Sequence, residues 1–486
     1  MQSTLTLEQR LAQAIIGQET ASTLMVDAYK FAMAQAGKPL CPETFALVFR
    51  RGCPFYNPFD LNAVVQSFRP ATLTLKEGAF LTANGYGMTP AMEVALTKPI
   101  RVVSAPKGTW VAPNTPAATV SSASFMASWS EHFAIMLHYP LQVATAIRKG
   151  ERHFVVVCPD EEKIVRIVAE ACGVTDVMVD TDTGYMDRVR AHAIAVKQAL
   201  KGEAHRAFEV GLRAATCIQQ HLMVLGVLRE VGIHKTSNVY GAWLLYMIPV
   251  GTTGHEHQMR WGGETADDRI GYRVIRDTRP EPPSYLFDTT DPIRRGIPRA
   301  FEVIAEDPLR PCSMRFDSGD QDVQFLMIKE MSDAYGVYPT LPFEDSYDAE
   351  KTIRNEAFCD KHEWPRHLRL YGYGGFLVSR PHPSPYSRDV VSASYKLACT
   401  AGQAVQKISG SPGKESIPGK PIVLQVTYPE INKNAVVYVI AQEWEEVDDS
   451  MSLPCPLDFI PEKITVLKSE QTCNLINSIH DNIARG

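Results

Sequence analysis

The sequence has no CxxC pair, no long apolar run and no excess of positive charge over its 486 residues. Its ten cysteines are scattered from Cys41 to Cys473, which argues against a zinc ribbon or a small disulfide scaffold and favours reduced thiols. The most apolar stretch, residues 242–250, contains a proline and is too short to span a bilayer. The first ten residues lack the basic and apolar segments of a signal peptide. We therefore expect a cytoplasmic protein without a membrane partner.

The charge balance argues against nucleic acid as a partner. Lysine and arginine number 49 and aspartate and glutamate 55, which gives a net charge of −6. A protein that gathers phosphate backbones carries a basic field, and the chain as a whole has none. Hydrophobic residues make up 45% and charged residues 21%, an ordinary globular composition that rules out a disordered chain or a coiled coil.

The secondary structure predicted from the sequence changes along the chain. Residues 1–40 are predicted to be helical, and short strands separated by Pro and Asn turns are expected from about 44 to 125. From about 150 to 400, short apolar runs such as Phe154–Cys158 alternate with helical stripes such as that from Met186 to Leu200. This alternation indicates parallel βα units, in a sheet or barrel whose chemistry gathers where strands end. Predicted strands at 422–426 and 435–440 suggest that the tail rejoins the N-terminal domain.

The segment Arg315-Phe-Asp-Ser-Gly-Asp320 follows a predicted strand and precedes a predicted helix over 323–335. Asp317 and Asp320 can accept hydrogen bonds from sugar hydroxyls or hold Mg²⁺, and Arg315 can bind an anion through two hydrogen bonds. The alternative is local, with Asp320 as an N-cap and Asp317 as a turn residue.

Glycines cluster after another predicted strand, in Tyr371-Gly-Tyr-Gly-Gly-Phe376. Glycine allows backbone N–H groups to approach a phosphate closely, and late strands of a barrel often build such a cradle. The alternative is a flexible loop or a tight turn. Neither this segment nor residues 410–415 has the spacing of a Walker loop.

The densest polar cluster is Gly251-Thr-Thr-Gly-His-Glu-His257. His255 beside Glu256 can act as a nucleophile or base. His255 and His257 also form an H-x-H pair that would bind a metal from one face of a strand. Two surface-loop histidines are the third interpretation, and the spacing does not separate the three.

Two further segments, Phe208–Arg213 and Lys235–Asn238, flank a predicted helix. Arg213 can clamp a carboxylate, and Ser237 with its neighbours can line a pocket. Equally, Arg213 suits a structural salt bridge and Ser237 suits a turn cap.

The order and spacing of these segments resemble those of the nicotinate phosphoribosyltransferase family over residues 20–425, approximately. No single motif is very specific for this family, but the whole series of motifs, in the order in which the family has them, is specific for it. The matching segments are Asp27–Tyr29, Phe49–Arg51, Gly108–Pro116, Glu209–Arg213, Thr236–Asn238, Gly251–His255, Asp288–Asp291, Arg315–Asp320, Tyr371–Gly375, Tyr395–Leu397, Lys407–Ser409 and Pro418–Lys420.

The resemblance implies an α/β fold. An irregular TIM-like α/β barrel would span residues 146–399, and a β-rich α+β domain over 1–145 would be completed by 400–486. The implied assembly is a homodimer whose active sites use residues of both subunits. The implied reaction, part of NAD salvage, joins nicotinate to phosphoribosyl pyrophosphate (PRPP) and gives nicotinate mononucleotide and pyrophosphate with Mg²⁺. In the family, ATP hydrolysis drives this reaction through a phosphohistidine, and His255 matches that position.

The resemblance also assigns roles around the pyridine ring and the ribose. Thr252 and Arg315 would lie beside the pyridine carboxylate, and Tyr29 of the partner subunit would stack on the ring. Asp317 and Asp345, the latter in Phe343-Glu-Asp-Ser-Tyr347, would meet the ribose. The resemblance does not identify the Mg²⁺ ligands.

The phosphate of PRPP is implied to lie on the glycine segment. Gly374 and Gly375 would cradle the 5-phosphate, helped by Arg50 or Arg51. The net negative charge is compatible with such a substrate because only a few cations need to converge on the pocket: Arg50, Arg213, Arg315 and Lys407.

The chain departs from the family at a few positions. Val210 stands where the family usually has phenylalanine, Ala214 where it has a second arginine, and the phosphate loop reads Gly-Gly-Phe in place of Gly-Thr. Nicotinamide phosphoribosyltransferase is therefore the alternative within the class. A metal-dependent hydrolase using His255 and His257 is the alternative from another class, and a catalytically inactive regulatory homologue is a third.

Overall fold

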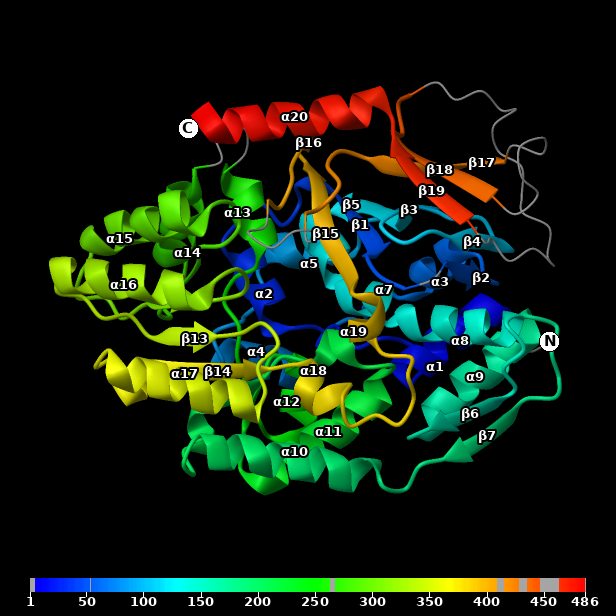
Figure 1. Cartoon of the computed structure of the whole chain (residues 1–486), viewed down its shortest axis with the longest axis horizontal. Helices are drawn as coiled ribbons and strands as arrows, with labels where there is room; N and C mark the ends of the chain where they lie inside the picture. Colours follow the sequence, from blue (N-terminus) through cyan, green and yellow to red (C-terminus); the bar gives the residue numbers. More distant parts are fainter. Residues whose placement is uncertain are drawn as a thin grey trace.

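The computed structural model describes residues 5–52, 54–262, 267–408, 415–427, 435–445 and 463–485. Ser409 and residues 410–414, which belong to the predicted loop before residue 420, lie outside these ranges. One hydrophobic cluster extends from the first helix through the described parts of both main sheets. Figure 1 gives the course of the chain and the labels of its elements.

A five-stranded antiparallel sheet brings distant parts of the chain together, in the order β16–β15–β1–β5–β3. β15 pairs with β1 from Ala393 opposite Phe49 to Thr400 opposite Glu43. The chain thus returns to the sheet of its N-terminal part after the α/β region, as Figure 1 shows. The strands are β1 (Pro42–Phe49), β3 (Arg101–Ser104), β5 (Pro116–Ala123), β15 (Ala393–Thr400) and β16 (Gln403–Ala404), with a separate ladder of β2 (Phe55–Asn57) and β4 (Thr109–Val111).

A parallel sheet occupies the middle of the chain, in the order β10–β9–β8–β14–β13. Two isolated bridges, Ser313 with Thr340 and Phe316 with Phe343, extend this order to β12, which pairs with β11. Among the described residues no ladder joins β10 to β11, so the closed TIM-like barrel stays a prediction, whereas the mixed α/β class is confirmed. The strands are β8 (Ala207–Glu209), β9 (Lys235–Thr236), β10 (Ile248–Pro249), β11 (Ser284–Leu286), β12 (Ser313–Arg315), β13 (Leu341–Phe343) and β14 (Arg369–Tyr373).

Helices lie between the parallel strands, and local sequence explains their limits. α16 begins after Asp320, whose carboxylate accepts two backbone N–H groups of the first turn, and ends at Gly336 with a φ of 69°. The apolar face of α9 is buried through Ile164, Ile167 and Val168, as the spacing of these residues in the sequence predicts. The longer helices of this region are α8 (His138–Arg148), α9 (Pro159–Ala171), α10 (Tyr185–Ala199), α11 (Ile218–Val231), α12 (Val239–Leu245), α13 (His255–Gly262), α14 (Asp268–Thr278), α15 (Ile297–Ala305), α16 (Gln321–Tyr335) and α17 (Ala349–Lys361), with the short α18 (Gly375–Val378) and α19 (Arg388–Val391).

The helices predicted over residues 1–40 are present, but three further helices within residues 61–96 lie where strands alone were expected. α1 begins with a capping box, in which Thr6 accepts the N–H of Gln9 and the Gln9 side chain accepts the N–H of Thr6. The helices of this part are α1 (Leu7–Ile16), α2 (Ala28–Gln35), α3 (Leu61–Ser67), α4 (Leu75–Ala83), α5 (Pro90–Leu96), α6 (Ser124–Trp129) and α7 (Glu131–Met136).

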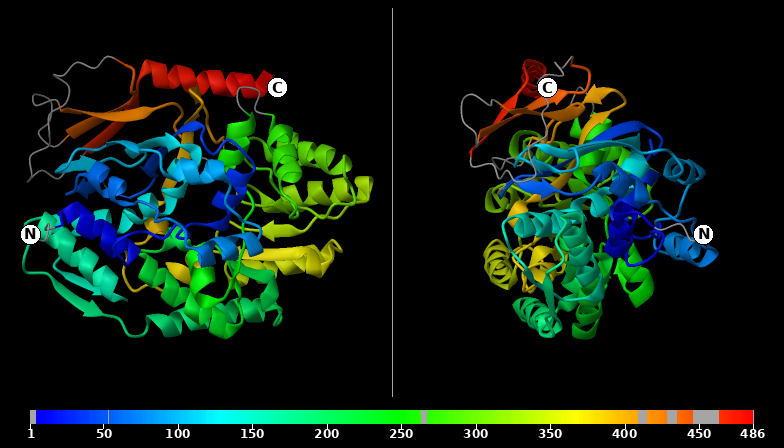
Figure 2. Two further views of the ribbon diagram at one scale, coloured as in Figure 1. Left: turned by 180° about the vertical axis from the view of Figure 1, so that it is seen from behind. Right: turned by 90° about the vertical axis from the view of Figure 1, so that its right-hand side faces the viewer.

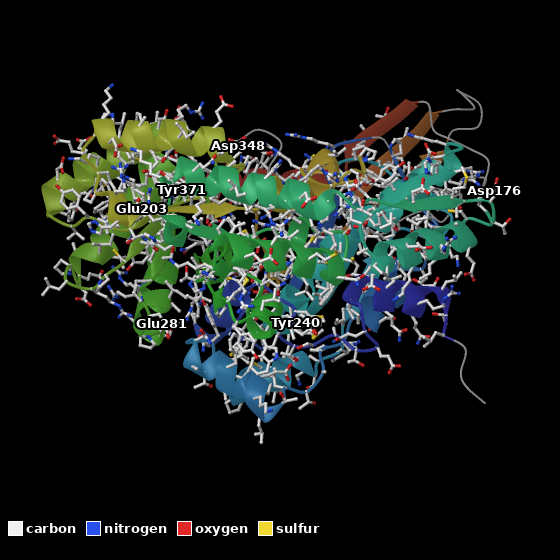
Figure 3. All side chains as sticks on the ribbon, turned by 90° about the horizontal axis from the view of Figure 1, so that it is seen from below. Asp176, Glu203, Tyr240, Glu281, Asp348 and Tyr371 are labelled. Carbon is white, nitrogen blue, oxygen red and sulfur yellow. The ribbon has the colours of Figure 1, made fainter. Side chains whose placement is uncertain are left out.

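Two smaller sheets lie at the periphery. β6 (His153–Val156) pairs with β7 (Met178–Thr181), and β18 (Ala435–Gln442) lies between β17 (Pro421–Thr427) and β19 (Lys463–Lys468). The last helix, α20 (Glu470–Arg485), runs along one side of the molecule in both views of Figure 2. Figure 3 places Asp176, beside β7, at the opposite end of the molecule from Tyr371 of β14. The division into domains at 145 and 400 stays a prediction.

In the described ranges, no helix combines the length and the apolar character that crossing a membrane requires.

A buried ion pair joins the two main parts of the fold. Arg260 of α13 donates to both carboxylate oxygens of Glu43 in β1, at 2.6 and 2.8 Å, and both side chains are almost fully buried. Removing one partner of such a pair leaves the other charge buried and uncompensated.

We expect Glu43→Ala to destabilise the protein by about 3–5 kcal/mol because it leaves the Arg260 guanidinium buried without its partner. The matched control is Glu170→Ala, because Glu170 makes the same two-bonded pair with Arg10 at an exposed surface. Urea unfolding followed by far-UV circular dichroism measures both variants. Equal midpoints for the two would contradict the importance of the buried pair.

Candidate functional site

Two adjoining cavities lie where the parallel sheet meets α2 and the antiparallel sheet. The inner cavity has a volume of about 230 Å³ and the outer cavity about 660 Å³. One set of side chains lines both, so a single ligand can extend from one cavity into the other. These shared residues are Glu131, Val210, Arg213, Asp317, Glu344, Tyr395 and Lys396.

Each site residue predicted from the sequence lines at least one of these cavities. The inner cavity is lined by Tyr29, Arg213, Ser237, Thr252, His255, Arg315 and Asp317. The outer cavity is lined by Arg50, Arg213, Asp317, Asp345, Gly374 and Gly375. Residues up to 346 positions apart in the sequence thus meet at one place, while their chemical roles stay predictions.

The loops after the parallel strands supply most of these side chains. The carboxyl ends of parallel strands lie at one edge of a sheet, which is where such folds gather polar residues. One cavity residue or near neighbour follows each strand: Val210 after β8, Ser237 after β9, Gly251 after β10, Asp288 after β11, Asp317 after β12, Glu344 after β13 and Gly374 after β14.

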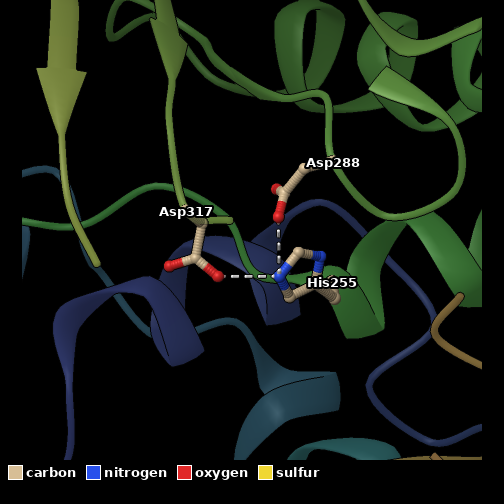
Figure 4. A group of neighbouring side chains, drawn as sticks. All are labelled: His255, Asp288 and Asp317. Atoms are coloured by element: carbon tan, nitrogen blue, oxygen red, sulfur yellow. Dashed lines mark hydrogen bonds and ion pairs between the residues drawn. The ribbon is translucent and has the colours of Figure 1, made fainter. Parts of the chain in front are cut away.

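His255, the first residue of α13, is the centre of a buried charged cluster (Figure 4). Its Nε2 lies 2.9 Å from Asp317 Oδ2, 4.0 Å from Asp288 Oδ2 and 2.7 Å from Lys407 Nζ. Its Nδ1 lies 3.0 Å from Thr289 Oγ1. Both ring nitrogens are therefore engaged by side chains from three other segments of the chain.

Whether Nε2 of His255 carries a proton decides which of its two neighbours, Asp317 or Lys407, it can form a hydrogen bond with. A protonated Nε2 donates to Asp317, whereas an unprotonated Nε2 accepts from the ammonium of Lys407, and one nitrogen cannot do both. Burial lowers the pKa of His255 to about 4, and the charge of Lys407 acts in the same direction. The imidazole is therefore neutral near pH 7 and keeps a lone pair on one nitrogen, as a nucleophile requires.

Two carboxylates lie beside His255: that of Asp317 is held ionised, and that of Asp288 is deeply buried. Burial alone would raise the pKa of Asp317, but the hydrogen bond with His255 and the charge of Lys407 bring it well below its usual value. Asp288 is 1% exposed, accepts a hydrogen bond from Ser318 through Oδ2, and has no partner for Oδ1 among the described residues. His255, Asp288 and Asp317 form a group whose ligand atoms lie close enough together to hold a cation.

α2 is fixed against this cluster by a buried ammonium. Lys30 lies 2.5 Å from Glu131 of α7 and 2.8 Å from Glu256 of α13, and its side chain is fully buried. Burial alone would lower the pKa of Lys30, but the two carboxylates raise it above its usual value. Ser128 donates to the other oxygen of Glu256 at 2.6 Å. The helix that begins at His255 is thereby tied to α2 and α7.

Tyr29 reaches the inner cavity of its own chain, although the resemblance implied that the partner subunit's Tyr29 does so. Its hydroxyl donates to Glu131 at 3.2 Å, and its ring lies over Gly254. The backbone at Gly251 approaches Tyr29 so closely that a Cβ there would lie 2.7 Å from the Tyr29 nitrogen. Glycine at 251 therefore allows α2 to pack against the loop before His255.

Ser237 is held by the residue before α2. Its hydroxyl donates to Asp27 Oδ1 at 2.6 Å, and the other oxygen of Asp27 lies 2.7 Å from His132 Nε2. A backbone hydrogen bond from the N–H of Ala28 to the carbonyl oxygen of Ser237, at 2.8 Å, strengthens this junction. Asp27 and His132 were not predicted as site residues, and they position Ser237 in the wall of the inner cavity.

Two cationic side chains, those of Arg213 and Lys396, line both cavities, and neither makes a side-chain hydrogen bond or ion pair with the described part of the chain. Burial alone would lower the pKa of Arg213, but the neighbouring Tyr29, Glu131 and Asp317 raise it above its usual value. Burial, together with the charges of Lys407 and Arg213, lowers the pKa of Lys396 to about 7. An anion bound beside Lys396 would favour its charged form and so draw a proton from solution.

Arg315 and Glu344 are neighbours in the wall of the inner cavity. Arg315 donates to the carbonyl oxygen of Thr253 at 2.6 Å, and its Nε lies 3.7 Å from Glu344 Oε1. Burial raises the pKa of Glu344 to about 7, although the charge of Arg315 opposes this shift. Glu344 was missed in the sequence because it precedes Asp345, the carboxylate on which the resemblance placed the ribose.

The glycine segment turns from β14 into α18 at the floor of the outer cavity. A Cβ at 375 would collide with the carboxylate of Asp389, so glycine here allows that side chain to lie against the turn. Arg388 and Asp389 approach from α19, and Arg388 donates to Asp389 at 3.2 Å. Burial lowers the pKa of Arg50 to about 10, with the charge of Arg388 acting in the same direction.

Two local interpretations from the sequence are settled by the structure. Asp320 is an N-cap, whereas Asp317 is not merely a turn residue because it contacts His255. The placement of the H-x-H pair on a strand is wrong, since His255 and His257 lie in α13 and two residues along a helix do not share a face. His257 contacts the carbonyl oxygen of Gly271 and lines neither cavity, so it cannot join His255 in a metal site.

Solved nicotinate phosphoribosyltransferases share this fold. The enzyme of Porphyromonas gingivalis superimposes with a TM-score of 0.60 over 81% of this chain and 95% of its own, at 16% sequence identity. The enzyme of Vibrio cholerae superimposes with a TM-score of 0.59 over 83% of this chain and 92% of its own, also at 16% identity. No protein-family model and no curated protein matches the sequence. The likeness establishes the mixed α/β fold that the resemblance implied, while the closed barrel stays a prediction.

We expect His255 to titrate with a pKa of about 4 and Lys407→Met to raise this value, because the substitution removes a neighbouring positive charge while burial remains. NMR of ¹³C-histidine-labelled protein, with the His255 signal assigned by its loss in His255→Asn, measures both values. Lys163→Met, at an exposed position of α9, is the control that should leave the titration unchanged. A wild-type His255 that titrates near 6.5 would contradict the assignment of a neutral, buried imidazole.

Proposed function

We propose that this chain is a nicotinate phosphoribosyltransferase, which forms nicotinate mononucleotide and pyrophosphate from nicotinate and PRPP, coupled to ATP hydrolysis. The observation that carries the proposal is the pair of adjoining cavities, one small with aromatic walls and the other large and cationic, that meet at Arg213 and Asp317, beside His255. The shared fold supports the same reaction class.

The inner cavity suits a pyridine carboxylate. Tyr29, Phe208 and Tyr395 line it, and aromatic faces bind a flat heterocycle by stacking. Phe208 of β8 and Val210, which follows this strand, both line the inner cavity, so Phe208 offers an aromatic ring near the position where the family usually has phenylalanine. The free guanidinium of Arg213 can hold the carboxylate through two hydrogen bonds.

The outer cavity suits the phosphates of PRPP. Its cationic side chains outnumber its carboxylates, and the glycine turn leaves the backbone open to a phosphate. The ring of cations would compensate a multiply charged anion in spite of the net charge of the chain. The cationic residues are Arg50, Arg51, Arg213, Arg380, Arg388, Lys396 and Lys407.

Transfer would take place where the cavities join. The lone pair of the pyridine nitrogen forms a bond to C1 of the ribose, and the bond from C1 to the pyrophosphate oxygen breaks with its electron pair remaining on the oxygen. Positive charge develops on the ribose in between, and the carboxylates of Asp317 and Glu344 lie at the shared wall to stabilise it. Lys396 and Lys407 would receive the charge of the departing pyrophosphate.

The residues beside His255 fit a Mg²⁺ ion. Mg²⁺ takes oxygen ligands and is usually held by one or two carboxylates together with substrate phosphates. Asp288 and Asp317 are the residues that would hold it, and the unpartnered Oδ1 of Asp288 is an acceptor available for that purpose. When bound, the ion would offset negative charge on the pyrophosphate group.

His255 is the residue that we assign to ATP coupling. A neutral ring nitrogen would attack the terminal phosphorus of ATP, ADP would leave, and water would later release phosphate. Lys407 contacts Nε2 and would neutralise the phosphoryl charge. Phosphorylation would draw Lys407 and Asp317 apart and so alter the outer cavity in which PRPP binds.

Nicotinate is favoured over nicotinamide by the free charge in the inner cavity. The carboxylate of nicotinate could accept two charge-assisted hydrogen bonds from the guanidinium of Arg213, whereas a neutral amide offers a single oxygen acceptor and no charge. The metal-dependent hydrolase is disfavoured because His257 points away from the cluster. A homodimer with shared sites and a cytoplasmic location stay predictions, and Tyr29 shows that one chain already supplies its own ring to the inner cavity.

We expect the purified chain to convert nicotinate with PRPP and Mg²⁺, and nicotinamide at least about 100-fold less efficiently in kcat/KM. Arg213→Met should raise the KM for nicotinate about 10- to 100-fold because it removes a charge-assisted hydrogen bond. Chromatographic separation of the mononucleotides measures both, and Arg166→Met, on the exposed surface of α9, is the matched control. No mononucleotide from either base would overturn the proposal.

We expect ATP to accelerate the reaction of the wild type and to have no effect on His255→Asn, so that the ratio of rates with and without ATP falls to about one. [γ-³²P]ATP should label the wild type at an acid-labile site and leave His255→Asn unlabelled. His257→Asn is the matched control because His257 lies on the same helix but lines neither cavity. Labelled His255→Asn would exclude the phosphohistidine at this position.

A further inference from the structure

A carboxylate of the chain itself lies on the glycine turn of the outer cavity, residues 374–376. Oδ2 of Asp389 is so close to Gly375 that a Cβ at this position would overlap it. Asp389 belongs to α19, and both Asp389 and Gly375 line the outer cavity. Glycine at 375 therefore admits a carboxylate to the turn on which the proposed function places a phosphate.

Two neighbouring side chains hold the Asp389 carboxylate in this place. Ser379 donates to its Oδ2 at 2.8 Å, and Arg388 donates to its Oδ1 at 3.2 Å. Burial alone would raise the pKa of Asp389, but the charge of Arg388 and the hydrogen bond from Ser379 lower it. Hydroxyl and guanidinium groups also donate to phosphate oxygens, so the carboxylate uses contacts that a phosphate would take.

Arg388 lies among other positive charges. Burial lowers the pKa of Arg388, and the charge of Arg213 acts in the same direction. The pKa of Arg50 is lowered in turn by burial and by the charge of Arg388. Like charges held near one another raise the free energy of the folded protein, and the contact between Asp389 and Arg388 offsets part of this repulsion. Asp389 thus supplies the negative charge that a bound phosphate would otherwise supply.

The Asp389 carboxylate can leave the turn by rotation of its side chain. This side chain is 47% exposed, so a rotation toward solvent removes little buried surface. A phosphate on the turn would lie against the carboxylate, and two anions in contact repel each other. Phosphate binding therefore requires the carboxylate to move, which releases the Ser379 hydroxyl and the Arg388 guanidinium to donate to the phosphate.

We infer that Asp389 is an intramolecular competitor of phosphate: its carboxylate occupies the glycine turn when no phosphate is bound and is displaced by the phosphate of a sugar phosphate. The inference rests on the proposed function for the position of that phosphate. When only a fraction of the molecules can bind a ligand, the apparent Kd rises by the inverse of that fraction. A carboxylate seated in about nine molecules of ten thus weakens phosphate binding about tenfold.

Ribose 5-phosphate is the probe because it carries one phosphate on a pentose, and ribose is the control ligand without the phosphate. By isothermal titration calorimetry of the full chain, we expect Asp389→Asn to bind ribose 5-phosphate about tenfold more tightly than the wild type, and ribose no more tightly. Asp187→Asn, which removes the same charge from an exposed position of α10, should stay within about twofold of the wild type. Equal or weaker binding by Asp389→Asn, or no binding of ribose 5-phosphate to any of these proteins, would overturn the inference.

Two measurements separate displacement of the carboxylate from a simple loss of negative charge. At 1 M NaCl the Debye length is about 3 Å, so repulsion at a distance is screened whereas occupation of the turn is not. We expect Asp389→Asn to keep at least about a fivefold advantage at this salt concentration, and a ratio near one would contradict displacement. Gly375→Ala should lower the unfolding temperature by at least about 2 °C more in the wild type than in the Asp389→Ala background, because only the wild type holds a carboxylate against the new Cβ. Equal shifts would contradict the contact.

The same variants distinguish this inference from the proposed function. In the transferase assay we expect Asp389→Asn to lower the KM for PRPP about tenfold and to leave the KM for nicotinate within about twofold. A chain that forms no mononucleotide but binds ribose 5-phosphate more tightly as Asp389→Asn would lose the proposed activity and keep the competitor. An active transferase whose Asp389→Asn variant shows unchanged KM for PRPP and unchanged binding of ribose 5-phosphate would keep the activity and lose the competitor.

Discussion

The Lys30 ammonium, buried between Glu131 and Glu256, is the interaction on which the site depends. It joins α2, α7 and α13 through two carboxylates at 2.5 and 2.8 Å, and α13 begins with His255. Without this charge, two carboxylates would remain buried and uncompensated, and the helices would have to separate to admit water. The position of Tyr29 in the inner cavity and of His255 beside Asp317 both follow from it.

Charge is distributed unevenly between the helices and the cavities. Buried charges such as Arg260 and Glu43 form direct ion pairs, whereas the side chains of Arg213 and Lys396 in the cavities make none within the described ranges. The direct pairs hold the framework, and the cations without a direct partner are suited to an anionic ligand. The net charge of −6 for the whole chain therefore says little about the site, because cationic side chains outnumber carboxylates in the lining of the outer cavity.

α13 connects the site to the rest of the fold through three charged side chains. His255 at its start lies beside Asp317, Glu256 pairs with Lys30 of α2, and Arg260 pairs with Glu43 of β1. One helix thus joins the parallel strands, α2 and the antiparallel sheet at the edge of the inner cavity.

The sequence by itself determined the local elements and the inventory of the site. Periodicity located α9, α10 and α16, and strand-end motifs together with the family resemblance named residues such as Thr252 and Gly374 that do meet at the cavities. Tertiary structure decided what spacing cannot encode, namely which charges are buried together. His257 points away from the cluster because a helix, not a strand, begins at His255, and the place of Glu344 beside Arg315 became visible only when segments distant in sequence packed side by side. Burial and neighbouring charge, which depend on that packing, set the protonation of His255 and Lys396.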